Sequence, residues 1–253
     1  METEGRVILL GNAGVVLYYR GTRIIIDGLY KDLRDYFTDL PTGVWQLMKD
    51  GKGDLANAEY VFFTHSHFDH YYSPYFFDYM KNNTVKALIL PPLDGTKGLK
   101  EAYAEYGNLN LSLQAGQVIT LEHDIKLKVI KIRHVDKLYH SLPVLCFLFT
   151  VAGTKILFLS DADFDLASYR TLVEEKIDYL FVTPVFYNNV LGRQIIYDYL
   201  KVKKIIVYHL PNLEDDKYMY YKMVTRDVEK YAKGDEVIIW NRFGQYVSFG
   251  KSK

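Results

Sequence analysis

Four side chains that can bind metal ions occur within residues 64–70, which read Thr-His-Ser-His-Phe-Asp-His. Imidazole and carboxylate groups suit zinc, manganese and iron. In an extended chain, residues two apart point the same way, so His65 and His67 can hold one ion together. Asp69 and His70 lie where the chain turns toward a helix, and they can face a second ion. Chance would produce His-x-His-x-Asp-His on the order of 4 times in 10,000 such chains, so the segment predicts a metal site.

Three more candidate ligands each follow a segment that is typical of a buried or half-buried strand. They are His134 after residues 130–133, Asp161 after residues 156–160, and His209 after residues 205–208. An α/β protein places its site residues at strand ends, so these three side chains are expected to belong to the same site. His140 is a further candidate, as the residue that donates a proton to the leaving group if the site cleaves a bond. A histidine that caps a turn is an equal alternative.

The elements that must position these residues alternate between strands and helices. Strands are expected at residues 7–10, 15–20, 23–27, 60–64, 85–90, 118–134, 142–151, 155–159, 179–182, 204–208 and 237–240. Helices are expected at about residues 30–52, 73–82, 96–106, 167–177, 194–200 and 216–232, the second of them with Ser73 as N-cap. Runs of strands followed by strand–helix alternation, once in each half, predict an α/β sandwich of two packed sheets with helices outside.

Length and composition limit the function classes. The chain has 253 residues, with 31 basic and 31 acidic side chains, and this zero balance provides no field that attracts polyanions. Cys146 is the single cysteine, which indicates a reducing compartment. The apolar runs are too short to cross a bilayer, and residues 1–6 lack the features of a signal peptide. We therefore expect a soluble cytoplasmic protein with no membrane or nucleic-acid partner.

The ligand pattern resembles the metallo-β-lactamase-fold superfamily, over essentially the whole chain. All seven ligand positions of the two-metal members are matched, and residues 10–14 and 24–28 look like the first hairpin of the family. The start of the chain and His-Tyr-Tyr-Ser-Pro at residues 70–74 resemble the branch of ascorbate-6-phosphate lactonase and related phosphodiesterases. The resemblance implies a four-layer αββα sandwich and a single domain over residues 1–253, with two pseudo-equivalent halves that meet near residues 115–125.

The resemblance also implies a ligand set for two divalent metal ions, with zinc as the first choice and manganese or iron as alternatives. The first ion would be bound by His65, His67 and His134, the second by Asp69, His70 and His209, and Asp161 would bridge them. Two such ions lower the pKa of a water between them toward neutrality, and Asp69 can orient that water and accept its proton. The implied activity is hydrolysis of a phosphoester, lactone or related ester of a small-molecule substrate. The oligomeric state is left open.

Several alternatives stay open at this stage. A diiron redox or oxygen-handling protein is one, although flavodiiron proteins carry Glu at the position of His67. A nuclease acting on RNA or DNA is another, although no basic arm is visible. A metal-bound sensor without turnover is a third. Secreted two-zinc β-lactamases carry Cys at the position of Asp161, which argues against that branch.

Candidates for stacking on a substrate are Tyr71, Tyr72 and Tyr187.

Overall fold

The computed structural model describes residues 4–114, 116–234 and 236–250. The chain divides into two compact units, of which the first comprises Met1–Gln114 and Arg242–Lys253 and the second Ala115–Asn241. The C-terminal segment therefore returns to the first unit. Residues 1–3, which begin the stretch expected to lack the features of a signal peptide, lie outside the described residues. None of the described helices is long and apolar enough to cross a membrane.

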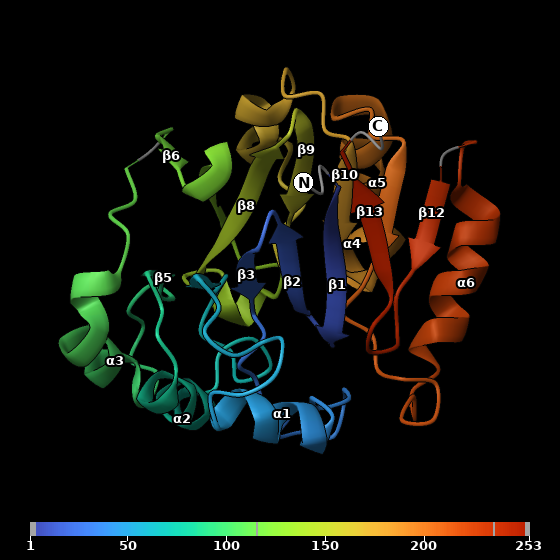
Figure 1. Ribbon diagram of the computed structural model, residues 1–253. Helices are drawn as coiled ribbons and strands as arrows, with labels where there is room; N and C mark the ends of the chain where they lie inside the picture. Colours follow the sequence, from blue (N-terminus) through green and yellow to red (C-terminus); the bar gives the residue numbers. More distant parts are fainter. Residues whose placement is uncertain (1–3, 115, 235, 251–253) are drawn as a thin grey trace. The chain divides into compact units, whose positions relative to one another are not determined.

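The first unit holds a six-stranded sheet with the strand order β13-β1-β2-β3-β4-β5 (Figure 1). Its strands are β1 (Gly5–Gly11), β2 (Gly14–Tyr19), β3 (Thr22–Ile26), β4 (Tyr60–Phe62), β5 (Ala87–Ile89) and β13 (Tyr246–Phe249). Its helices are α1 (Thr42–Lys49), α2 (Ser73–Asn82), α3 (Leu99–Tyr106) and the 3-10 turn η1 (Gly107–Leu109). Neighbours from β13 to β3 pair antiparallel, whereas β3, β4 and β5 pair in parallel.

The second unit holds a seven-stranded sheet with the strand order β12-β11-β10-β9-β8-β7-β6. Its strands are β6 (Val118–Thr120), β7 (Lys126–Arg133), β8 (Pro143–Val151), β9 (Thr154–Phe158), β10 (Tyr179–Val182), β11 (Lys204–Val207) and β12 (Glu236–Ile239). Its helices are α4 (Pro184–Asn188), α5 (Val190–Gln194) and α6 (Tyr220–Tyr231), with η2 (Glu122–Asp124), η3 (Lys137–Tyr139), η4 (Leu166–Leu172) and the π-turn η5 (Ile195–Tyr199). Neighbours from β6 to β9 pair antiparallel, and β9 to β12 pair in parallel, as in the first unit.

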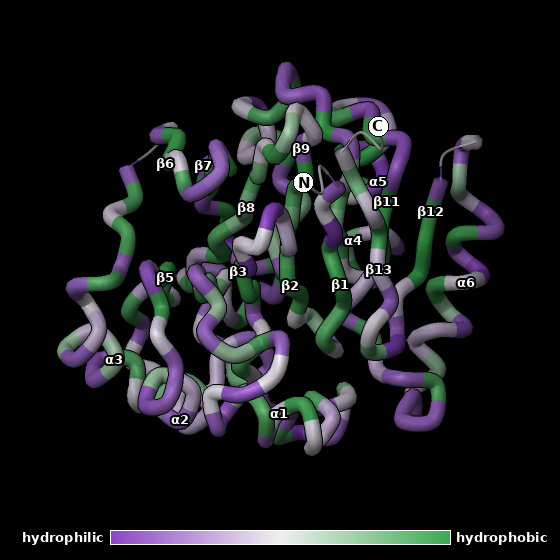
Figure 2. The backbone as a smooth tube through the Cα atoms, in the orientation of Figure 1, coloured by the Kyte–Doolittle hydropathy of each residue, from purple (hydrophilic) through white to green (hydrophobic). Residues whose placement is uncertain are grey.

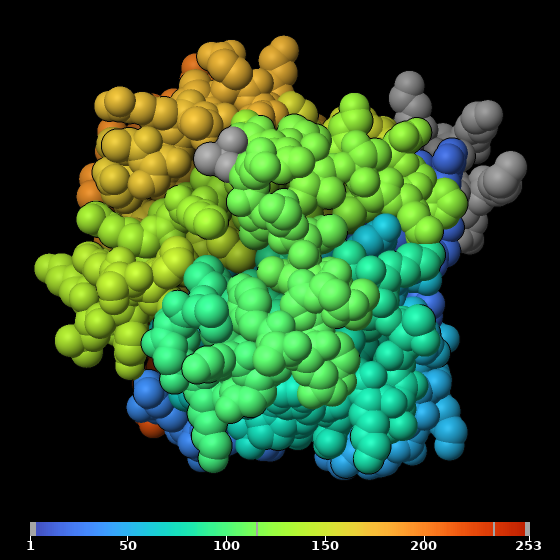
Figure 3. Space-filling model, turned by 90° about the vertical axis from the view of Figure 1, so that its left-hand side faces the viewer, coloured from blue at the N-terminus to red at the C-terminus, as the bar shows by residue number. Residues whose placement is uncertain are grey.

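Each unit buries one face of its sheet against its own helices. In the first unit the core joins Val61 and Leu88 of the sheet to Phe76 and Tyr79 of α2. In the second unit the core joins strands β8–β11 to α4, η5 and α6. The strands are mostly hydrophobic along their length, whereas hydrophobic and hydrophilic residues alternate along the helices (Figure 2). Helix α3 and the residues after it lie at the surface in green (Figure 3). Each unit therefore supplies one sheet and one helix layer.

The predicted strands are present, except that the strand expected over residues 118–134 is broken by the 3-10 turn η2 into β6 and β7. The strand β13 was not predicted. The predicted helix over residues 30–52 is wrong for its first half, because residues 31–40 form a loop and only α1 is helical. The predicted helix over residues 167–177 is wrong, because only the 3-10 turn η4 forms there and it ends at Leu172. Lys176, which follows, has a positive φ of 49° that no helix accommodates. Tyr72, not Ser73, is the N-cap of α2, since the Ser73 hydroxyl donates to the Lys97 carbonyl oxygen instead.

Candidate metal centre

Residues 64–70 follow β4 of the first unit and turn back on themselves before α2. The backbone N–H groups of His70 and Tyr71 both donate to the carbonyl oxygen of His67, at 2.9 and 2.7 Å. The buried side chain of Asn12, at the tip of the hairpin between β1 and β2, donates from Nδ2 to the carbonyl oxygen of Asp69 at 2.9 Å. The turn is therefore fixed both locally and by the hairpin.

A buried carboxylate at the end of β3 orients two of the histidines. Asp27 accepts hydrogen bonds from the Thr64 N–H at 2.8 Å and from the Thr64 hydroxyl at 2.7 Å. His70 Nδ1 lies 2.9 Å from the same carboxylate and donates to it. Because the Thr64 hydroxyl donates to Asp27, it accepts from His65 Nδ1 at 3.0 Å. Both rings therefore carry their proton on Nδ1, which leaves the Nε2 lone pairs of His65 and His70 available for a metal ion.

Asp27 was not predicted from the sequence as a functional residue. It ends the apolar run Ile24–Ile26, which is the signal that singled out Asp161. The residue has a positive φ of 50°, as do Ser160 at 50° and His209 at 65°. Backbone strain of this kind at the ends of β3, β9 and β11 is typical of functional sites.

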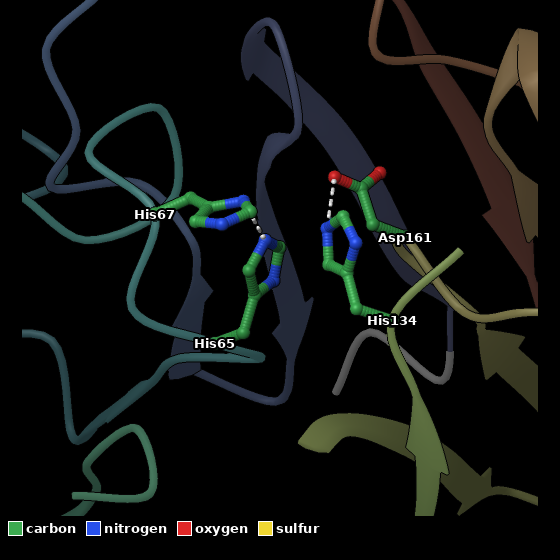
Figure 4. Close-up of side chains that lie close together, drawn as sticks. All are labelled: His65, His67, His134 and Asp161. Atoms are coloured by element: carbon green, nitrogen blue, oxygen red, sulfur yellow. Dashed lines mark hydrogen bonds and ion pairs between the residues drawn. The ribbon is translucent and has the colours of Figure 1, made fainter. Parts of the chain in front are cut away.

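The ligand atoms of the first unit form two close pairs. His65 Nε2 lies 3.2 Å from His67 Nδ1 (Figure 4). Tetrahedral zinc with Zn–N bonds of about 2.0–2.1 Å places its ligand nitrogens about 3.3 Å apart, so this spacing suits one shared ion. His70 Nε2 and Asp69 Oδ2 are 3.9 Å apart. The first unit therefore brings together four of the predicted ligands as two pairs.

In the second unit, main-chain hydrogen bonds join the end of β7 to the segment after β9. The Val135 N–H donates to the carbonyl oxygen of Asp161 at 2.8 Å, and His134 forms an isolated bridge with Ala162. These bonds place the side chains of His134 and Asp161 side by side, although 27 positions separate them along the chain.

The carboxylate of Asp161 lies between two histidines of its own unit. Its Oδ2 is 3.5 Å from His134 Nε2 (Figure 4), and its Oδ1 is 3.8 Å from His209 Nε2. Each oxygen therefore faces a different ring. The three predicted ligands of the second unit are thus brought together, with the carboxylate in the middle.

The ring of His134 is held differently from those of His65 and His70. The backbone N–H of Asp136 donates to His134 Nδ1 at 3.0 Å, so the ring proton lies on Nε2 and faces Asp161. Metal binding at Nε2 requires that proton to move to Nδ1, at the cost of the bond from Asp136. The donors of both units, imidazole and carboxylate without thiolate, fit divalent zinc, manganese or iron.

The remaining predicted residues have other environments. His140 is half-buried and caps the end of η3, and it is the neighbouring Tyr139 whose ring contacts His134 edge-on at 5.7 Å. The catalytic role of His140 stays a prediction. Stacking on a substrate is wrong for Tyr71 and Tyr187, which are 1% and 0% exposed and are part of the cores.

No protein-family model matches the chain, and no curated protein matches it in sequence. Solved structures resemble it in fold. An isothiocyanate hydrolase from gut bacteria of Delia radicum has a TM-score of 0.67 at 15% identity, over 97% of this chain and 99% of that one. The metallo-β-lactamase fold protein YhfI from Bacillus subtilis has a TM-score of 0.61 at 11% identity, over 98% and 100%.

A third structure, the diiron β-hydroxylase CmlA from Streptomyces venezuelae, has a TM-score of 0.59 at 14% identity, over 99% of this chain. This chain spans about half of CmlA, at 55% of its length. Sequence identities this low carry information on the fold alone. The two sheets and two helix layers, together with these likenesses, confirm the predicted α/β class: the chain has the metallo-β-lactamase fold.

Proposed function

We propose that the chain is a metal-dependent hydrolase that binds two divalent metal ions. The ligands of the first ion would be His65, His67 and His134, those of the second Asp69, His70 and His209, with Asp161 shared between them. The observation that carries this proposal is the place of Asp161 between two histidines, at 3.5 and 3.8 Å. A carboxylate with one imidazole on each side is the arrangement that a bridge between two ions needs.

The residues of the chain have distinct roles in this proposal. When bound, the ions supply a water of lowered pKa and polarise the bond that is cleaved. The half-buried carboxylate of Asp69 accepts the proton of the attacking water. Asp27, directly and through Thr64, keeps the rings of His70 and His65 in the tautomer that exposes Nε2. His140 is the proposed proton donor to the leaving group.

The proposed substrate is a small metabolite with a phosphoester, lactone or related ester bond. The neutral net charge supports a small substrate over a nucleic acid. The likeness to a hydrolase of isothiocyanates, which are small molecules, supports hydrolysis. Zinc is the proposed metal, and the donor set also accepts manganese or iron.

Metal content and turnover of matched variants test this function. Protein purified without chelators should hold close to two transition-metal ions per chain and hydrolyse a member of a panel of phosphodiesters, phosphomonoesters, lactones and thioesters. Asp161→Ala should retain about one ion and lose turnover, since three histidines remain for the first ion. Asp198→Ala is the matched control, because Asp198 is exposed and paired only with Lys233 among the described residues. Two ions and near-normal turnover in Asp161→Ala would exclude the bridging role.

A second candidate is a diiron oxygen-handling protein, which the fold likeness to the diiron β-hydroxylase CmlA favours. Its support in this chain is a donor set without thiolate, which suits iron. A visible absorption spectrum distinguishes the two candidates. Iron-loaded protein with visible absorption that dithionite bleaches, and with no hydrolysis of the panel, would favour the diiron candidate over the hydrolase.

A further inference from the structure

The segment at residues 161–164, which we call the aspartate segment, pairs with the end of β7 in the same unit. In addition to the bond between the Val135 N–H and the Asp161 carbonyl oxygen, the Asp163 N–H donates to the carbonyl oxygen of Arg133 at 3.0 Å. The pairing is antiparallel, so Arg133 stands opposite Asp163 and Val135 stands opposite Asp161. The main chain of Asp161 is therefore fixed along the edge that faces β7.

The far end of the aspartate segment is tied to the core of the second unit. The hydroxyl of Tyr169, which is fully buried, donates to the Asp163 carbonyl oxygen at 2.6 Å. The Asp163 carboxylate also pairs with Arg133 and accepts from the Phe164 N–H at 2.7 Å. Because the Arg133 side chain is 51% exposed, water screens this ion pair and it contributes little to stability. The hydrogen bond from Tyr169 is the stronger anchor, since burial excludes competing water.

The near end of the aspartate segment is strained. Ser160, which directly precedes Asp161, is fully buried and has a positive φ of 50°. A residue with a side chain adopts this left-handed conformation at a cost in free energy, and the conformation persists only where the surrounding structure holds it. Rotation of Ser160 to a negative φ would redirect the chain at Asp161 and move its carboxylate. The bonds of the aspartate segment therefore oppose a relaxation that would displace a proposed ligand.

We infer that Tyr169 is a positioning residue for the carboxylate of Asp161. Its hydroxyl holds the aspartate segment at Asp163, and this keeps Ser160 in the strained conformation. Without the hydroxyl, Ser160 can relax, and the carboxylate of Asp161 then leaves its place between its two histidine neighbours. The consequence for metal binding rests on the proposed function, in which two ions share this carboxylate.

Tyr169→Phe tests this role, because the substitution removes the hydroxyl and keeps the aromatic ring in the core. The affinity for the second proposed ion, measured by competition with a chelator, should fall about tenfold, the lower limit for a residue that acts through a ligand. The affinity for the first ion should change by less than about threefold, since three histidines remain to bind it. The two affinities therefore respond differently to one deleted hydroxyl.

A second substitution separates positioning from a general loss of stability. Glycine adopts a positive φ without strain, so a chain with Ser160→Gly no longer needs the anchor. Added to Ser160→Gly, Tyr169→Phe should weaken binding of the second ion by less than about threefold, compared with about tenfold in the wild-type background. An equal loss in both backgrounds would overturn the inference, because a weakened core would act in both.

Tyr79→Phe is the matched control. Tyr79 is also fully buried, and its hydroxyl donates to the Leu55 carbonyl oxygen at 2.9 Å and accepts from the Ala58 N–H at 3.0 Å, in the first unit. This variant therefore loses at least as many hydrogen bonds, yet both metal affinities should equal those of the wild type. An unchanged affinity in Tyr169→Phe, or an equal loss in Tyr79→Phe, would reject the positioning role.

Hydrogen exchange of the metal-free protein separates this inference from the proposed function. In Tyr169→Phe, the Val135 and Asp163 N–H groups should exchange about tenfold faster than in the wild type, whereas N–H groups in the centre of β8 should change less. If this pattern appears in a chain that binds no metal, the positioning role stands and the metal-dependent function is rejected. If Val135 and Asp163 exchange as in the wild type, the positioning role is rejected, whatever the metal content.

Discussion

Asp27→Asn is the substitution that most sharply tests how the first unit prepares its ligands. Asp27 is fully buried and adopts a positive φ of 50°, which asparagine tolerates well, so the backbone can stay as it is. Three donors surround the carboxylate: the Thr64 N–H at 2.8 Å, the Thr64 hydroxyl at 2.7 Å and His70 Nδ1 at 2.9 Å. An amide offers one acceptor oxygen and two N–H donors in the same space.

The amide changes which ring nitrogen carries the proton in His65 and in His70. If its oxygen accepts from the Thr64 N–H, its NH2 group faces the Thr64 hydroxyl and His70 Nδ1. The hydroxyl then accepts from the amide and donates to His65 Nδ1, so both rings must carry their proton on Nε2. The reversed amide instead leaves the buried Thr64 N–H without an acceptor, which costs about 1–3 kcal/mol. In the first orientation, metal binding at either Nε2 requires the ring proton to move to Nδ1, at the cost of the hydrogen bond that Nδ1 accepts.

The expected loss follows from the position of Asp27, which is one hydrogen bond from the proposed ligand His70 and two, through Thr64, from the proposed ligand His65. Removing such a partner costs 10–100-fold in metal affinity, or about 1.4–2.7 kcal/mol for each ion. Because His65 and His70 belong to different proposed ions, both affinities should fall. The metal-free protein should lose no more than about 1 kcal/mol, since the new tautomers satisfy the amide, and this loss lowers the melting temperature by roughly 2–4 °C.

Metal affinity is measured by competition with a chelator, and the ring protons by nitrogen-15 spectra of the metal-free histidines. Asp198→Asn is the control, an exposed aspartate whose side chain is 62% accessible. The reasoning is refuted if Asp27→Asn binds both ions as tightly as the wild type, or if the spectra still show the Nδ1 proton on His65 and His70.

Three further predictions concern the second unit. His134→Ala should remove the first ion and leave most of the second, which metal analysis by mass spectrometry can measure. Burial raises the pKa of the Cys146 thiol, so Ellman's reagent should react with it only when the protein unfolds. Although partial burial opposes it, hydrogen bonds from Lys128 and Lys155 lower the pKa of Glu175. Glu175→Gln should therefore cost about 1 kcal/mol in urea unfolding at pH 7, and this difference should shrink as the pH falls from 4.5 through the lowered pKa of Glu175.

The sequence was sufficient for the strands that the structure buries on both faces. Runs such as residues 60–64 and 204–208 are short, mostly apolar and rich in β-branched or aromatic residues. This composition is typical of a buried strand. The strand β13 could not be predicted in the same way. Its residues, Tyr-Val-Ser-Phe, are only partly apolar, and its partner β1 lies at the opposite end of the chain.

The loop at residues 31–39 shows why local periodicity failed elsewhere. Its polar composition resembles an exposed helix, yet Asp32 and Asp39 bond to nearby backbone N–H groups and compete with helical hydrogen bonds. The late start of α6 has the same cause. Asp216 was expected inside this helix, but it precedes the helix, and its carboxylate accepts from the N–H groups of Tyr220 and Tyr221 in the first turn. Side-chain acceptors of this kind decide helix boundaries, and sequence periodicity does not register them.

The two halves of the ligand set depend on the fold to different degrees. The first unit presents four proposed ligands from one continuous segment, so their spacing is a property of the local chain and the sequence alone could predict them. The second unit presents His134, Asp161 and His209 from the ends of three strands, β7, β9 and β11. Their distances depend on the pairing of those strands and on the bond between Val135 and Asp161, which no local pattern contains. Strand ends and resemblance could nominate these three residues, but only the folded sheet brings the two oxygens of Asp161 to face two different rings.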